Sequence, residues 1–169
     1  LFYLMMYNES LPMPARPDHV ALDDGVVRGG YLLEPAAGDG PRVNLLGSGT
    51  ILFEVMQAAN TLRDEGYAVA VYSITSYVEL ARDAERAEQE DAVDTAWLDT
   101  IFPETDVPTV AATDYVRALP RMIASWINGP FTALGTDGFG KSERRSDLRA
   151  HFKVDAASIA DAARRLASS

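Results

Sequence analysis

The sequence predicts an α/β fold, with a mainly parallel β-sheet that carries helices on both faces. Short apolar runs recur along the chain, and segments with apolar residues at helical spacing lie between them. The order is one strand followed by four strand–helix pairs, an alternation that is typical of parallel sheets. Because no crossover helix precedes the second strand, the first strand fits an antiparallel edge of the sheet.

Five segments are predicted to be strands because each is a short, mostly apolar run bounded by turn-forming residues. In chain order they are residues 26–34, 42–46, 67–74, 108–112 and 131–134. Gly47, Ser48, Gly49 and Thr50 turn the chain after the second strand. A further short apolar run at 97–102 precedes the fourth strand.

The first two helices are predicted from periodicity and capping residues. Apolar residues recur at helical spacing after the second strand, at Leu52, Val55, Met56, Ala59 and Leu62. Gly66 closes that helix. Ser76 and Glu79 have the spacing of a capping box, so another helix begins there. The polar stretch that follows it, at 82–94, is expected to be a solvated helix or loop.

The last two helices are predicted to begin at short polar side chains. Thr113 or Asp114 is expected to cap the helix after the fourth strand, and Pro120 falls near the start of that helix. Asp155 is expected to cap the final helix, which would carry its apolar face on Ile159, Ala163 and Leu166.

The composition limits the classes of function. The chain has 169 residues, of which 47% are hydrophobic, enough for one domain with a core. Its net charge of −10 argues against a nucleic-acid partner. The absence of cysteine excludes disulfides and thiolate metal sites, and it fits a reducing, cytoplasmic compartment. No apolar run approaches the roughly 20 residues that a membrane span needs.

Catalytic and metal-binding motifs are not predicted from residue spacing. The only histidines, His19 and His151, do not form a metal-ligand pair, and no Gly-x-Ser-x-Gly nucleophile motif is present. Gly47-Ser48-Gly49 lacks the third glycine or the lysine of a nucleotide-binding loop, so a tight turn with a hydroxyl cap is the better interpretation.

The beginning of the chain is expected to lie outside the main domain. Residues 1–7 form an unbroken apolar run, which predicts a strand buried on both faces. Pro12, Pro14 and Pro17 stiffen the linker predicted at 8–24. We therefore expect residues 1–19 to hold the end of a preceding domain and a linker, and residues 20–169 to form one α/β domain. The chain is interpreted as a fragment of a longer protein.

Several stretches in order resemble the C-terminal end of the homodimeric bacterial pyruvate dehydrogenase first component, the decarboxylating subunit of its complex. They are Tyr7-Asn8-Glu9 with Met13-Pro14, Leu45 to Gly49, Val71 to Ser76 with Glu79 to Asp83, Ala112 to Tyr115, and Gly135 to Asp155. The last is the most specific, because transketolases and the heterotetrameric relatives carry only a looser Asp-x-Phe-Gly version. The resemblance implies the transketolase C-terminal domain fold, a three-layer α/β/α sandwich with a five-stranded, mostly parallel sheet and one antiparallel edge strand.

The resemblance also implies a chemistry for the parent enzyme. In that family thiamine diphosphate with Mg²⁺ serves the decarboxylation of pyruvate, and the acetyl unit passes reductively to a lipoyl group on dihydrolipoamide acetyltransferase. The cofactor lies between two other domains across the dimer interface, so this chain is expected to bind no cofactor and to be inactive alone. Residues 1–7 would be the last strand of the pyrimidine-binding domain. Gly38-Asp39-Gly40 mimics the cofactor motif, but no asparagine follows at 65–70, so a hairpin turn is predicted instead.

The resemblance and the residue pattern together give candidate site residues. Glu9 matches an acidic residue that the family places near the active site. A histidine commonly follows three positions later, where this chain has Pro12, so no substrate-binding histidine is assigned. The segment after the fifth strand is expected at the carboxyl edge of the sheet, facing the dimer mate or the cofactor-bearing domains. Its interface candidates are Asp137, Phe139, Lys141, Arg144, Arg145 and Arg149.

Three alternatives remain open from the sequence. The segment 143–149 could be a solvated helix in which Glu143 and Asp147 pair with the basic residues. The whole chain could be the C-terminal domain of a transketolase or another thiamine enzyme. It could also be a non-catalytic α/β interaction module. The discriminating feature is whether the chain carries a cofactor site of its own, and the sequence shows none.

Overall fold

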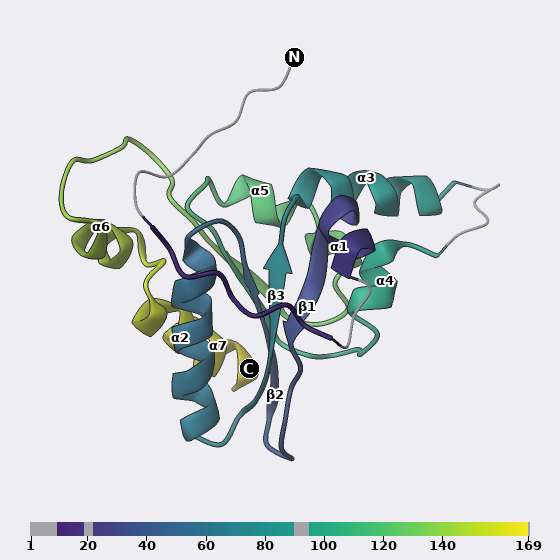
Figure 1. The fold of residues 1–169 in the computed structure, drawn as a ribbon, viewed down its shortest axis with the longest axis horizontal. Coiled ribbons are helices and arrows are strands. Elements are labelled where there is room, and N and C mark those ends of the chain that lie inside the picture. Colours follow the sequence, from purple (N-terminus) through teal and green to yellow (C-terminus); the bar gives the residue numbers. More distant parts are fainter. Residues whose placement is uncertain (1–9, 19–21, 90–94, 169) are drawn as a thin grey trace.

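The computed structural model describes residues 10–18, 22–89 and 95–168, which form an α/β domain built around one five-stranded sheet (Figure 1). The strands lie in the order β1-β3-β2-β4-β5. Their bounds are β1 Gly30–Glu34, β2 Arg42–Gly47, β3 Ala68–Ile74, β4 Thr109–Ala112 and β5 Phe131–Leu134. The strand β1 pairs antiparallel with β3, and all other pairs are parallel. The predicted mostly parallel sheet with an antiparallel edge strand is therefore confirmed.

Helices cover both faces of this sheet and make the three layers (Figure 1). Their bounds are α1 Leu22–Arg28, α2 Ile51–Asp64, α3 Tyr77–Ala87, α4 Trp97–Ile101, α5 Ala118–Arg121, α6 Arg145–Phe152 and α7 Ala156–Ala167, with a 3₁₀ turn at Ala124–Trp126. The helices α2 and α7 pack together on one face, whereas α3 and α4 cover the other.

Two apolar cores lie on opposite sides of the central strands. All seven residues of β3 are buried, and their side chains alternate between the cores. Val69 and Val71 join the core under α2 and α7, whereas Ala70 and Tyr72 join the core under α3 and α4. A strand that is covered on both faces has a continuous apolar sequence rather than an alternating one. This explains why β3 was predicted almost to the residue.

The prediction of a strand over 26–34 was wrong in its first half. Residues 22–28 form α1, and β1 begins only at Gly30. Asp23 and Asp24 lie in the first turn of α1, where carboxylates interact favourably with the helix dipole. Gly29 ends the helix at a φ of +106°, and its N–H donates to the Gly25 carbonyl oxygen at 3.1 Å. Residues 22–24 of the predicted linker at 8–24 therefore belong to α1.

The helix caps were predicted with mixed success. The Ser76 hydroxyl accepts a hydrogen bond from the Glu79 N–H at 3.2 Å, as the capping-box spacing predicted. Asp155 occupies the first position before α7, but its side chain accepts no capping bond. The first helical N–H, that of Ala156, donates instead to Glu54 of α2 at 2.9 Å. Thr50 likewise forms no side-chain cap, and the Ser48 hydroxyl donates to Thr113 at 2.7 Å.

Several predictions fall on residues whose structure is not described. The strand expected at 1–7, the candidate residue Glu9, and His19 all lie outside the described ranges. The division of the chain at residue 19 therefore stays a prediction. Among the described residues, no helix has both the length and the apolar character that crossing a bilayer requires.

The Gly38-Asp39-Gly40 stretch turns the chain between β1 and β2. The predicted hairpin was wrong, because β3 lies between these two strands in the sheet and each of them pairs with β3. A Cβ atom at Gly40 would lie 1.8 Å from the Gly66 carbonyl oxygen, so two backbone turns touch here without room for a side chain. Asp39 is exposed, so its side chain takes no part in this close contact.

We expect Gly40→Ala to lower the free energy of unfolding by about 2–4 kcal/mol, because a backbone overlap must be relieved by moving one turn. Asp39→Ala should change that free energy by less than about 0.5 kcal/mol, as surface substitutions usually do. Urea denaturation of both variants measures the difference. A larger loss in Asp39→Ala than in Gly40→Ala would contradict a purely structural role for this turn.

Candidate functional site

Three loops meet at the carboxyl edge of the parallel strands. They follow β2 at residues 48–50, β4 at 113–117 and β5 at 135–144. The Thr136 N–H donates to the Tyr115 carbonyl oxygen at 2.8 Å, and Thr136 also hydrogen-bonds the Asp114 carbonyl oxygen through its hydroxyl. Loops beyond the carboxyl ends of parallel strands are where open α/β sheets place their ligand and partner sites. This edge is therefore the candidate functional site.

A glycine and an aspartate fix the loop that follows β5. A Cβ atom at Gly135 would lie 2.5 Å from the Tyr115 carbonyl oxygen, so this close approach requires glycine. Asp137 accepts hydrogen bonds from the Arg117 backbone N–H at 2.9 Å and from Arg117 Nε at 2.6 Å. These bonds, the backbone one first, hold the pKa of the Asp137 carboxyl below its usual range. The sequence placed Asp137 in the site but missed Arg117.

A signal for Arg117 was present in the sequence. It is a basic residue in the loop that follows a predicted strand, which is the same positional feature that selected the residues after β5. What the sequence did not contain was the pairing, since Arg117 and Asp137 lie 20 residues apart in different loops.

A cavity of about 380 Å³ opens between the loops and α6. Its lining includes Thr50, Phe139, Lys141, Arg145 and Arg149. The Phe139 side chain stands at the tip of the loop and is 96% exposed, an unusual position for a large aromatic residue. The site therefore combines an apolar tip with three basic side chains.

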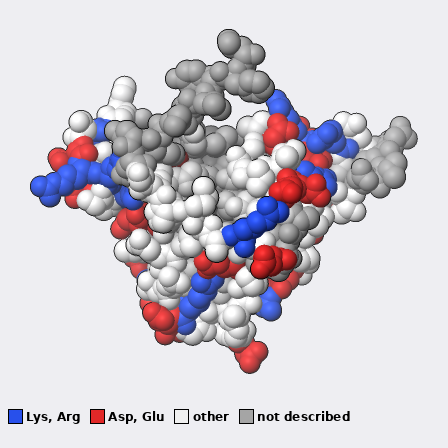
Figure 2. Space-filling model, in the orientation of Figure 1, with Lys and Arg blue, Asp and Glu red and all other residues white. Residues whose placement is uncertain are grey.

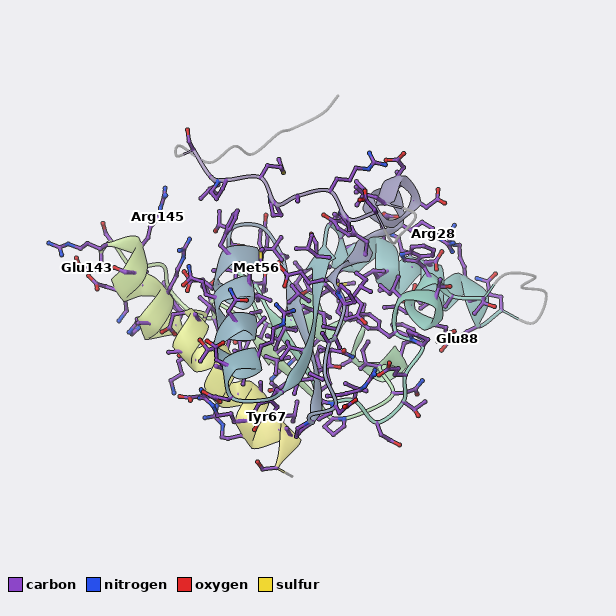
Figure 3. All side chains as sticks on the ribbon, turned by 60° about the horizontal axis from the view of Figure 1, so that its bottom comes forward. Arg28, Met56, Tyr67, Glu88, Glu143 and Arg145 are labelled. Carbon is purple, nitrogen blue, oxygen red and sulfur yellow. The ribbon has the colours of Figure 1, made fainter. Side chains whose placement is uncertain are left out.

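Lys141 and Arg144 precede α6 and Arg145 begins it. Figure 3 shows Arg145 and Glu143 at the end of the molecule that lies beyond α2. Figure 2 shows Lys and Arg side chains projecting at this end beside acidic ones, so the surface is mixed rather than uniformly basic. Lys141, Arg144 and Arg145 are exposed. Their predicted role at an interface remains a prediction.

Arg149 is tied into the domain itself. Its Nη1 lies 2.8 Å from Glu54 Oε1, and the two side chains are only 23% and 14% exposed. The other oxygen of Glu54 accepts the Ala156 N–H. One carboxylate of α2 thus holds both α6 and the start of α7. Arg149 and Arg145 line the same cavity, but no sequence pattern indicates that Arg149 has a partner 95 residues away.

The described residues do not fit a thiamine diphosphate or magnesium site. No group of three His, Cys, Asp or Glu side chains that could hold a metal ion occurs among them. The Gly38-Asp39-Gly40 turn lies between β1 and β2, at the end of the sheet opposite to the three loops. We therefore assign no cofactor-binding residue, and the expectation that this chain binds no cofactor stays a prediction.

Comparison with known proteins identifies the family of this domain. The family model described as the transketolase-like C-terminal domain matches residues 29–155. The chain belongs to this family. The match begins at the glycine before β1 and ends at the residue before α7, so it contains all five strands and the three loops of the candidate site.

Curated relatives of this transketolase-like C-terminal domain are longer proteins. The pyruvate dehydrogenase E1 component of Escherichia coli K12 is 39% identical over 168 residues, which are 96% of this chain and 19% of the relative. The Corynebacterium glutamicum pyruvate dehydrogenase E1 component is 37% identical over 94% of this chain and 18% of the relative. The chain thus spans about a fifth of these relatives and is homologous to their C-terminal region.

Among solved structures, transketolase from Leishmania mexicana superposes with a TM-score of 0.61 at 22% identity, over 86% of this chain and 19% of that one. Transketolase from Campylobacter jejuni gives a TM-score of 0.56 at 20% identity, over 89% of this chain and 20% of that one. These likenesses show the fold, and they confirm the transketolase C-terminal-like architecture that the resemblance implied.

Proposed function

We propose that this chain is the C-terminal domain of an acetyl-transferring pyruvate dehydrogenase first component, and that it supports the dimer and borders the entrance to the active site. The observation that carries the proposal is the 39% identity to the Escherichia coli enzyme over 96% of this chain. The decarboxylation itself belongs to the parent enzyme. Thiamine diphosphate and Mg²⁺ are held by domains outside this chain, and the isolated chain is inactive.

The residues of this chain contribute a rigid platform for the rest of the enzyme. The Arg117–Asp137 pair and Gly135 hold the start of the loop after β5, and Phe139 follows two residues later with its side chain exposed. Exposed aromatic side chains are common anchors of protein interfaces. We assign this surface, with Lys141, Arg144 and Arg145 around it, to contact with the dimer mate or the cofactor-bearing domains. Glu9 is assigned to the border of the active site.

The partners and the compartment follow from the same proposal. The domain works within a homodimer, the parent passes its acetyl unit to dihydrolipoamide acetyltransferase, and the enzyme is cytoplasmic. A transketolase is the second candidate, because the superposed structures are transketolases. Sequence identity favours the first, since those structures are at most 22% identical and the pyruvate dehydrogenase relatives reach 39%.

Domain replacement tests the proposal. In a chimera, this chain replaces the matching 168 residues of the Escherichia coli pyruvate dehydrogenase E1 component. The chimera is expected to be dimeric and to reductively acetylate lipoyl groups with pyruvate at a rate within about tenfold of the natural enzyme, a cost of about 1.4 kcal/mol for imperfect contacts.

Two controls complete the test. The same enzyme truncated before the replaced region should be inactive or aggregated, because its docking surface is uncovered. A chimera that carries the C-terminal domain of Leishmania mexicana transketolase should be much less active. A chimera with this chain that folds, binds thiamine diphosphate and still performs no better than the truncated enzyme would contradict the proposal.

A further inference from the structure

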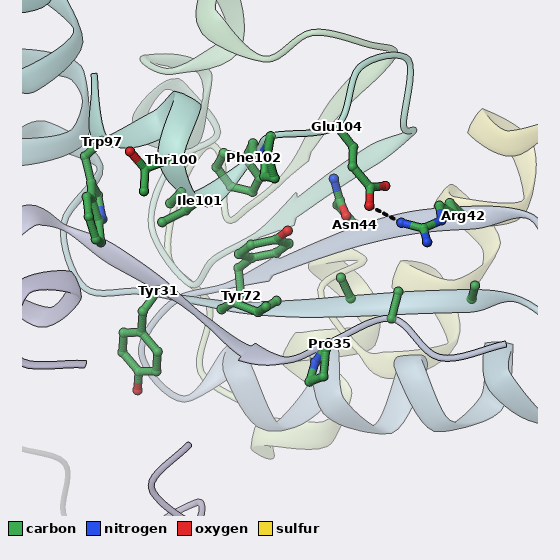
Figure 4. Close-up of a pocket in the computed structure, with 15 residues that line it drawn as sticks. Tyr31, Pro35, Arg42, Asn44, Tyr72, Trp97, Thr100, Ile101, Phe102 and Glu104 are labelled. Atoms are coloured by element: carbon green, nitrogen blue, oxygen red, sulfur yellow. Dashed lines mark hydrogen bonds and ion pairs between the residues drawn. The ribbon is translucent and has the colours of Figure 1, made fainter. Parts of the chain in front are cut away.

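A second and larger cavity lies on the face of the sheet opposite to α2 and α7, away from the loops at the carboxyl edge (Figure 4). It has a volume of about 550 Å³, within the range of small-molecule sites. The floor comes from β2 and β3, and the walls come from β1, from α4 and from the segment after α4. The lining is mainly apolar and aromatic, with Tyr31, Tyr72, Trp97 and Phe102 among its residues.

The floor carries two polar side chains, Asn44 and Tyr72, that can offer hydrogen bonds to the cavity. The Tyr72 residue is 6% exposed, and its hydroxyl, which makes no hydrogen bond to another described residue, remains accessible from the cavity. Asn44 is 9% exposed, and its amide nitrogen makes only a 3.5 Å contact with the Thr109 hydroxyl. Buried side-chain polar atoms in proteins are usually hydrogen-bonded. A ligand that fills the cavity and buries Asn44 and Tyr72 would therefore have to hydrogen-bond both of them.

The two groups are placed to act together. Asn44 and Tyr72 lie on neighbouring strands and line the same side of the sheet, since Asn44 is paired with Ala70 and Leu46 with Tyr72. Figure 4 shows both side chains directed into the cavity. Burial, and then the nearby Glu104 carboxylate, raise the pKa of Tyr72 to about 12, so the hydroxyl remains a donor at neutral pH. The amide of Asn44 offers both a donor and an acceptor.

The charges at the cavity do not favour an ionic ligand. Among the described residues that line it, the charged side chains are Arg42 and Glu104, and they form an ion pair with each other. A ligand carboxylate would have to compete with Glu104 for Arg42, and a ligand ammonium would have to compete with Arg42 for Glu104. A neutral ligand avoids either competition, and flat aromatic walls favour a planar one.

We propose that this cavity binds a neutral, planar ring compound that carries an amide-type edge, with Asn44 and Tyr72 hydrogen-bonded to that edge. The ring lies among the aromatic side chains of the walls. This site is independent of the role proposed for the carboxyl edge. It lies toward the amino ends of β2 and β3, on the face of the sheet opposite to α2 and α7.

Benzamide is the probe of choice, with toluene and benzoate as matched compounds. Titration of the 169-residue chain, followed by nuclear magnetic resonance, should give saturable shifts of the Asn44 side-chain amide and of the Trp97 indole N–H. Toluene lacks the polar edge and benzoate is an anion, so both should bind several-fold more weakly. Absence of saturable shifts with benzamide would overturn the proposal, and so would binding of toluene or benzoate as tight as that of benzamide.

Variants distinguish binding at the proposed site from nonspecific binding of the probe. Tyr72→Phe removes only the hydroxyl, so it should leave the melting temperature unchanged and weaken benzamide binding by about three- to tenfold, the size expected for one hydrogen bond. Asn44→Ala should weaken binding at least as much. Tyr77→Phe is the matched control, because Tyr77 is also buried but does not line the cavity. Equal benzamide affinity in Tyr72→Phe and Tyr77→Phe would overturn the assignment.

Discussion

Replacing Glu54 by alanine is expected to lower the free energy of unfolding of this chain by about 2–4 kcal/mol. Glu54 is 14% exposed and accepts from Arg149 at 2.8 Å and from the Ala156 N–H at 2.9 Å. Its removal leaves a half-buried guanidinium and the first N–H of α7 without their partner. Unpaired buried donors of this kind cost far more than the hydrogen bond contributed when it was formed.

Two further variants separate the contribution of the Glu54 charge from that of its hydrogen bond to α7, and from that of an exposed ion pair. Glu54→Gln keeps an acceptor for the Ala156 N–H but loses the negative charge, so its loss should be about half that of the alanine variant. Glu65→Ala is the matched control, because Glu65 also lies at α2 and binds an arginine of a later helix, but its side chain is 39% exposed. Exposed pairs contribute little, so the Glu65 variant should unfold almost like the natural chain.

Urea denaturation with constant m-values measures these differences. Equal losses in Glu54→Ala and Glu65→Ala would show that Glu54 is an ordinary surface ion pair, and that α7 does not depend on it for its first turn.

Replacing Phe139 by serine should leave the isolated chain unaffected and weaken the chimeric enzyme. The side chain is 96% exposed, so the stability of the chain alone should not change. In the chimera, an aromatic anchor buried at an interface contributes about 2 kcal/mol or more, which corresponds to roughly 30-fold weaker association. Analytical ultracentrifugation at decreasing enzyme concentration measures this, and turnover should fall in parallel.

Val27→Ser provides the control for Phe139. Val27 is 77% exposed on α1, which packs next to β1. The strands β1 and β5 are the two opposite edge strands of the sheet. The Val27 variant should dissociate like the unmodified chimera. A Phe139 variant that associates and turns over normally would remove Phe139 from the docking surface and favour the solvated loop.

The strands could be predicted from sequence because they are buried on both faces or bounded by turns. Their apolar runs leave no competing interpretation at β3 or β4. The error at 26–34 arose because Val26 and Val27 have strand propensity, whereas their exposure shows that no sheet face selected them. Gly29 was the available signal, since a glycine after a short acidic segment is typical of a helix end.

The candidate site was predictable in position but not in its pairings. Strand order and glycine content placed the loop after β5 at the carboxyl edge before any contact was known. The partners of Arg149 and Asp137 lie 95 and 20 residues away, and one sequence holds no information on such distances. The same limit explains the Asp155 cap, because the acceptor at the start of α7 came from Glu54 on a different helix.

Hydrogen–deuterium exchange bears most directly on the docking role of this domain, with the isolated chain compared with the same residues in the chimeric enzyme. We expect slower exchange in the chimera at residues 113–117 and 135–144, where the loops would be covered. At residues 102–107, beside the second cavity, exchange should be unchanged. Unchanged exchange in both carboxyl-edge loops of an active chimera, or protection that appears only at residues 102–107, would show that the domain docks through another face.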